Sequence, residues 1–186
     1  MASSRAAGQF LDALSKFEVD VPQAIAQNRL KIVEWHPHAK AHAAGAEAGG
    51  HVLRNSGDLP ELEIALSNAM ESLAPDLPRR VVLEILSPAL LAFEVGQVRE
   101  FVQRAKEKLS GGRATALFLL QKERLEPATL SDIRAVFDGV VDIERVGEGD
   151  SIVRELCVPS MVGQSPVAPC AIAVQEGKLC LTMPVA

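Results

Sequence analysis

Hydrophobic and polar residues follow two different rhythms along the chain. Four segments place apolar residues three and four positions apart, which predicts helices with one buried face: residues 10–18, 58–73, 95–109 and 129–137. Four other segments are short and rich in apolar residues, which predicts strands: residues 30–33, 80–86, 114–120 and 140–146. Strands that alternate with helices pair in parallel through right-handed crossovers. The pattern therefore predicts an α/β fold with a mostly parallel sheet flanked by helices.

Two of these segments carry more specific signals. Asp58 precedes the second helical segment as an N-cap, with Pro60 inside the first turn and Glu61 three residues on. Residues 80–86 read RVVLEIL, a run that is typical of a strand buried on both faces of a sheet. We therefore expect both faces of that strand to be covered.

The rhythm changes after Val146. Residues 152–158 alternate between apolar and polar as a half-buried strand does. Residues 170–174 and 179–183 flank a Glu-Gly turn and predict a hairpin. Together they predict a C-terminal antiparallel β extension.

Residues 36–57 are rich in alanine, glycine and histidine and show little periodicity, which predicts a flexible loop. Within it, His36, His38 and His42 have the spacing HxH-x3-H, which can present imidazoles to a metal ion. We favour a solvated loop over a metal site, because only two nearby glutamates and no nearby cysteine are at hand to complete the set.

Composition and charge narrow the classes of function. The length of 186 residues predicts a single domain over residues 1–186. A net charge of −5 and an aromatic content of 4% argue against a nucleic-acid binder. No apolar run reaches the roughly 18 residues of a membrane span, and the three cysteines lack the CxxC spacing. We expect a cytoplasmic protein with no membrane segment.

Several segments resemble the RecA-like core of KaiC-type ATPases, including archaeal relatives such as the gas-vesicle regulator D group. Residues 10–33 resemble that family's helix, its x-D turn and its LxIV strand. VVLEILSP at residues 81–88 resembles the Walker B strand, which DSLS usually follows. Residues 114–118 and 137–143 resemble the next two strands, and RELCVPSMVG at residues 154–163 resembles RxLxVxKMRG. The resemblance spans nearly the whole chain and implies a RecA-like sheet.

The sequence departs from this family where the family carries its chemistry. The Walker A loop GxxxxGK[ST], which cradles a triphosphate, is absent. The Walker B Asp aligns with Glu84, and the paired glutamates that include the general base have no counterpart. The Lys and Arg that reach a neighbouring subunit's nucleotide align with Ser160 and Val162. The resemblance thus implies a degenerate domain with no catalytic residue and no resident cofactor, to which ATP and Mg²⁺ bind only with a missing segment or a partner.

Two functions stay open. The first is a non-catalytic domain that acts by self-association, or by binding and regulating an active ATPase of the same superfamily. The second is a component that binds a nucleotide or small ligand and receives its phosphate-binding loop from elsewhere. In that case Glu84 and Ser87, at the Walker B-like position, line a cleft with the strand end at residues 120–121, because ligands of open α/β sheets bind at the carboxyl ends of strands. The simpler interpretation of Glu84 is a carboxylate that pairs with an arginine or caps a turn.

Overall fold

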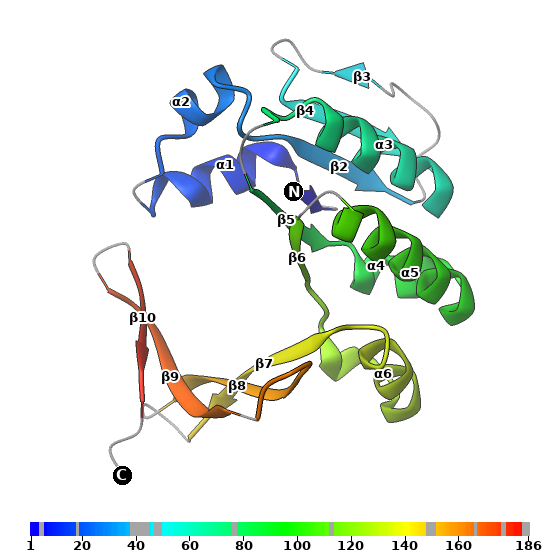
Figure 1. Ribbon diagram of the computed structural model, residues 1–186. Coiled ribbons are helices and arrows are strands. Elements are labelled where there is room, and N and C mark those ends of the chain that lie inside the picture. The colour runs from blue at the N-terminus through cyan, green and yellow to red at the C-terminus, as the bar shows by residue number, and fades with distance from the viewer. Residues whose placement is uncertain are drawn as a thin grey trace. The chain divides into compact units, whose positions relative to one another are not determined.

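The computed structural model describes ten ranges of the chain: residues 1–3, 6–17, 19–37, 45–46, 50–75, 78–111, 114–147, 152–165, 167–175 and 178–183. The chain forms two compact units, Met1–Leu130 and Ser131–Ala186. Each unit has its own β-sheet, and Figure 1 shows the elements in chain order from blue to red. The single domain that the chain length predicts over residues 1–186 stays a prediction beside these two contact units.

The sheet of the first unit is mostly parallel. Its strands are β1 (Ala2–Ser3), β2 (Ile32–His36), β3 (Gly45–Ala46), β4 (Val52–Ser56), β5 (Arg79–Glu84) and β6 (Ala114–Phe118). They lie in the order β3-β4-β2-β1-β5-β6, and only β3 runs antiparallel to its neighbour. Numbered along the chain, the five parallel strands have the order 3-2-1-4-5 of a doubly wound sheet, whose topological switch point lies between β1 and β5. The predicted α/β fold with a parallel sheet is confirmed.

Helices cover both faces of this sheet. They are α1 (Ala7–Ser15), α2 (Val21–Ala26), α3 (Leu59–Glu71), α4 (Leu86–Ala92) and α5 (Val95–Gly111), and a 3₁₀ turn, η1, follows β6 at Lys122–Arg124. Helix α1 packs its Ala7 against Ile32 and Val52. Helices α3 and α5 lie side by side in Figure 1 and share a cavity with Val81 and Leu83 of β5.

The ends and buried faces of the helices follow from the sequence. The Asp58 side chain accepts a hydrogen bond from the Glu61 amide at 3.0 Å, which confirms the predicted N-cap of α3. On α5, Val98, Phe101 and Val102 are buried at helical spacing. Burial of each such side chain stabilises the fold by about 1.5–3 kcal/mol relative to exposure.

Three predictions for the first unit need correction. Residues 52–56 belong to the predicted loop 36–57 but form β4, because pairing with β2 orders a segment whose own pattern is weak. The strand predicted at residues 80–86 is fully buried on one face only, since Val81 and Leu83 are buried while Val82 on the other face is half-buried. The sequence pattern also missed β1, which spans two residues and is too short to show a period.

The second unit is an antiparallel sheet. Helix α6 (Pro127–Arg134) leads into β7 (Gly139–Val146), β8 (Val153–Met161), β9 (Val167–Gln175) and β10 (Lys178–Thr182). The strands lie in the order β10-β9-β8-β7, and every neighbouring pair is antiparallel. The predicted C-terminal antiparallel extension is confirmed. The prediction that residues 140–146 continue the parallel sheet is wrong, because β7 pairs with β8.

Candidate functional site at the carboxyl ends of the parallel strands

A row of polar side chains crosses the first sheet near the carboxyl ends of its strands. Arg54 of β4 pairs in register with Glu34 of β2, and Glu34 with Ser3 of β1. Ser3 in turn pairs with Glu84 of β5. Because residues in register point to the same face of a sheet, these four side chains share one face.

The Glu34 carboxylate is the most enclosed charged group of this row. Its side chain is 8% exposed, and one of its oxygens accepts a hydrogen bond from the backbone N–H of Ala7. The other oxygen accepts a hydrogen bond from Nε of Arg54 at 3.0 Å. Ala7 is the first residue of α1, so the carboxylate lies at the helix N-terminus, where the helix dipole favours a negative charge.

The protonation of Glu34 reflects these contacts. Burial by itself raises the pKa of the carboxyl. The hydrogen bonds from Ala7 and Arg54, together with the positive charge of Arg54, outweigh the burial and hold the pKa below its ordinary value. Glu34 is therefore a fixed negative charge at neutral pH.

A hydrogen bond joins the two strands at the switch point. The Ser3 hydroxyl donates to Oε2 of Glu84 at 2.9 Å, from β1 to β5. Ligands of doubly wound proteins bind in the crevice outside this point of the sheet. Glu84 therefore stands where the fold places its ligands, and it contacts a serine there.

Glu84 and Ser87 line a cavity of about 290 Å³ beyond the ends of β5 and β6. Leu120 and Gln121 line it too, so the structure brings together the residues that the sequence suggested. The Ser87 hydroxyl of α4 accepts a hydrogen bond from the Gln121 amide at 3.0 Å, which ties α4 to the end of β6. Arg124 adds a guanidinium group to the lining. Sequence reasoning missed Arg124, because only the 3₁₀ turn η1 brings it to this edge.

Of the three histidines that the sequence suggested as metal ligands, the structure describes one. His36 ends β2 and is exposed. His38 and His42 lie outside the described residues. Within the described part of the chain, no group of three metal-ligating side chains is close enough to hold an ion.

Comparison with protein families identifies the chain. Residues 13–143, which include Glu34, Glu84 and Ser87, match a family of unknown function, DUF7504. The chain belongs to the DUF7504 family. No curated protein matches it. The strands β8, β9 and β10 of this DUF7504 protein lie beyond the matched residues.

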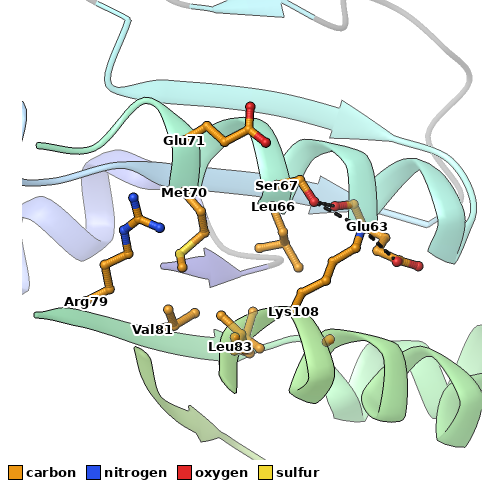
Figure 2. Close-up of a pocket in the computed structure, with 11 residues that line it drawn as sticks. Glu63, Leu66, Ser67, Met70, Glu71, Arg79, Val81, Leu83 and Lys108 are labelled. Carbon is orange, nitrogen blue, oxygen red and sulfur yellow. Dashed lines mark hydrogen bonds and ion pairs between the residues drawn. The ribbon is translucent and has the colours of Figure 1, made fainter. Parts of the chain in front are cut away.

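A second and larger cavity of the DUF7504 protein lies between α3, α5 and β5. It has a volume of about 450 Å³. Figure 2 shows Leu66 and Met70 of α3 on one side and Val81 and Leu83 of β5 on the other. These four side chains make much of its lining apolar. Its ends carry charges of both signs, from Lys108 and Glu63 at one end and from Arg79 and Glu71 at the other.

The Lys108 end of this cavity is an ion-pair cluster around Glu63 of α3. Lys108 Nζ lies 2.9 Å from one carboxylate oxygen, and Arg104 Nε lies 3.0 Å from the other. Burial raises the pKa of Glu63, but the hydrogen bonds and charges of the two cations outweigh it, so the pKa lies below its ordinary value. Arg104 also pairs with Glu100 of α5 at 3.6 Å in an i,i+4 arrangement, so that it joins this pair to Glu63 of α3.

Proposed function

We propose that this protein is a non-catalytic RecA/KaiC-like domain that acts by association, either with itself or with an active ATPase of the same superfamily. The observation that carries the proposal is the position of Glu34. A carboxylate of the protein itself takes the backbone N–H at the start of α1.

This position matters because of the fold. In doubly wound proteins the turn after the first strand binds phosphate, and the phosphate lies at the N-terminus of the first helix. Here residues 4–6 alone separate β1 from α1. The negative charge of Glu34 would repel a phosphate at this turn. This repulsion supports the proposal that the domain binds no phosphate there. The absence of a GxxxxGK[ST] sequence from the chain agrees with it.

Exposed leucines support a role in association. Leu117 and Leu119 at the end of β6 are 56% and 44% exposed, and Leu91 of α4 is 75% exposed. Strand β6 is the last in the order of strands that the structure describes in this sheet. The backbone of an edge strand can form hydrogen bonds with another chain, and its exposed apolar side chains can be buried against that chain.

The test combines two measurements on the full chain. Light scattering on a size-exclusion column reports its mass, and a titration with Mg-ATP reports nucleotide binding. The proposal predicts a mass above that of one chain, or capture of a RecA/KaiC-like ATPase, with no ATP turnover. A monomer that hydrolyses ATP contradicts it.

The cavity beside Glu84 favours a second candidate function. A space of about 290 Å³ with a carboxylate, a hydroxyl and a guanidinium in its lining suits a small polar ligand. In this candidate the protein is a nucleotide- or small-ligand-binding component whose phosphate-binding loop comes from another chain. Saturable nucleotide binding that Glu84→Gln weakens distinguishes it from the first candidate. Glu94→Gln, at the exposed residue just before α5, is the control and should leave the binding unchanged.

A further inference from the structure

Three arginines surround a cavity at the opposite, amino-terminal end of β5. The cavity has a volume of about 390 Å³, and Arg29, Arg79 and Arg80 line it together with Leu73 and Ala74. Arg79 and Arg80 begin β5, and Arg29 follows α2. Three of the residues that line this one small space are arginines, in a chain whose net charge is −5.

Among the residues that the structure describes, no carboxylate pairs with these three arginines. The ion pairs of the described residues do not include Arg29, Arg79 or Arg80. Two of them donate hydrogen bonds to neutral acceptors. Arg29 donates to the Gln27 side chain at 3.3 Å, and Arg80 donates to the Arg79 carbonyl at 3.1 Å. Their positive charge is therefore available to an external anion.

The arginine cavity adjoins the apolar cavity of about 450 Å³ between α3 and α5, because Arg79 lines both. In Figure 2 the Arg79 guanidinium extends from the start of β5 towards Met70, at the mouth of the apolar space. Leu66 and Val81 line that space further in. A cationic compartment thus opens beside an apolar one, with Arg79 at the boundary.

We propose that the two cavities form one binding site for a small phosphomonoester with an apolar body. The phosphate group lies among Arg29, Arg79 and Arg80, and the apolar body lies between α3 and α5. The planar guanidinium group gives two parallel N–H donors to phosphate oxygens, and a doubly charged phosphate matches several arginines better than a carboxylate does. The volume of each cavity is within the usual range for ligand pockets, about 300–1,000 Å³.

The site is distinct from the cavity beside Glu84. It lies at the amino-terminal end of β5 rather than at its carboxyl end, and it shares no lining residue with the Glu84 cavity. A test of this site is therefore independent of a test of the proposed function.

Calorimetric titration of the full chain with hexyl phosphate tests the proposal. We expect saturable binding of one ligand per chain, at least tenfold tighter than binding of inorganic phosphate or of uncharged hexyl glucoside. Arg79→Gln should weaken the binding of hexyl phosphate about tenfold or more, because hydrogen bonds to charged groups contribute about 1.5–3 kcal/mol. Arg29→Gln should weaken it in the same direction, and it gives a second reading if Arg79→Gln fails to fold.

Two controls separate the compartments. Arg99→Gln removes the same charge from an exposed position of α5 and should leave the affinity unchanged. Leu66→Trp fills the apolar cavity and should weaken binding of hexyl phosphate but not of inorganic phosphate. The proposal is overturned if hexyl phosphate binds no tighter than inorganic phosphate. Equal losses of affinity in Arg79→Gln and Arg99→Gln also overturn it, because they indicate an effect of net charge alone. A lower Tm in Arg79→Gln with unchanged affinity overturns it too, because it indicates that Arg79 only supports the neighbouring helix ends.

Discussion

Glu34 accepts a hydrogen bond from the backbone amide of Ala7, so that a carboxylate from β2 lies at the N-terminus of α1. The same carboxylate accepts a charged hydrogen bond from Arg54 at 3.0 Å. One side chain thus joins β4, β2 and the first helix. It also gives the start of α1 an anion that the chain itself supplies.

Replacement of Glu34 should destabilise the first unit. Glu34→Ala leaves the Ala7 amide without its buried acceptor and Arg54 without this carboxylate, which predicts a loss of about 1–3 kcal/mol. Urea denaturation followed by circular dichroism measures the change. Glu94→Ala, an exposed carboxylate, is the matched control and should shift the free energy of unfolding by less than about 0.5 kcal/mol. Equal effects of the two changes would show that the contacts of Glu34 add little to stability.

The free energy of unfolding should also decrease in acid, as the directions of two pKa shifts predict. The pKa values of Glu34 and Glu63 lie below their ordinary value of 4.5 in the folded protein. A carboxyl with a lowered folded-state pKa adds stability that is fully present above its unfolded pKa and is lost as the pH falls through the folded pKa. We expect the contribution of these two carboxyls to the free energy of unfolding to be steady from pH 7 to about 5 and to decrease below 4.5.

Two variants connect this pH dependence to the named groups. Glu34→Gln and Glu63→Gln should each be less stable than the wild type at pH 7, and each should show a shallower decrease in stability towards pH 3. The measurement is urea denaturation at intervals of half a pH unit. A decrease as steep as that of the wild type in both variants would assign the acid sensitivity to other carboxyls.

Burial should decide the cost of removing a leucine from the first unit. Leu62 of α3 is 0% exposed, whereas Leu117 of β6 is 56% exposed. Leu62→Ala should cost about 2–5 kcal/mol, since it removes buried methyl groups and leaves a cavity. Leu117→Ala should cost less than about 0.5 kcal/mol. Thermal denaturation of both variants checks the difference, and comparable losses of Tm would mean that β6 is covered.

The exposed leucines should matter for association instead. Leu117→Lys combined with Leu119→Lys places two charges on the apolar end of β6. We expect this double variant to lower the mass that light scattering reports, or to abolish capture of a partner ATPase, while the Tm stays within a few degrees. The control is Gln103→Lys, at an exposed position of α5. An unchanged assembly in the double variant would exclude this end of β6 as the interface.

The long elements of this fold could be predicted from the sequence, and the short ones could not. The helices α3 and α5 repeat their apolar residues over several turns, so their periods are clear. Strand β1 spans two residues and β4 has the weak pattern VLRNS, and both depend on pairing with β2. Because these strands set the order of the sheet, the sequence could not place the switch point between β1 and β5.

Some residues of the candidate site could likewise be predicted from the sequence, and others could not. Glu84 and Ser87 could be named, because they lie at the end of an apolar strand, at the position that resembles Walker B. Nothing in the local pattern around Glu34 indicates that it meets Ala7, which is 27 residues earlier in the chain. The grouping of Arg29 with Arg79 and Arg80 likewise depends on tertiary packing that brings the end of α2 to the start of β5.

The most direct test of the central claim is a calorimetric titration of the full-length chain with Mg-ATP, together with an assay of phosphate release. Because Glu34 already holds the amide at the start of α1, the wild-type protein should show no saturable binding into the millimolar range and no release of phosphate. Saturable binding of Mg-ATP at micromolar concentration, accompanied by measurable turnover, would contradict the account.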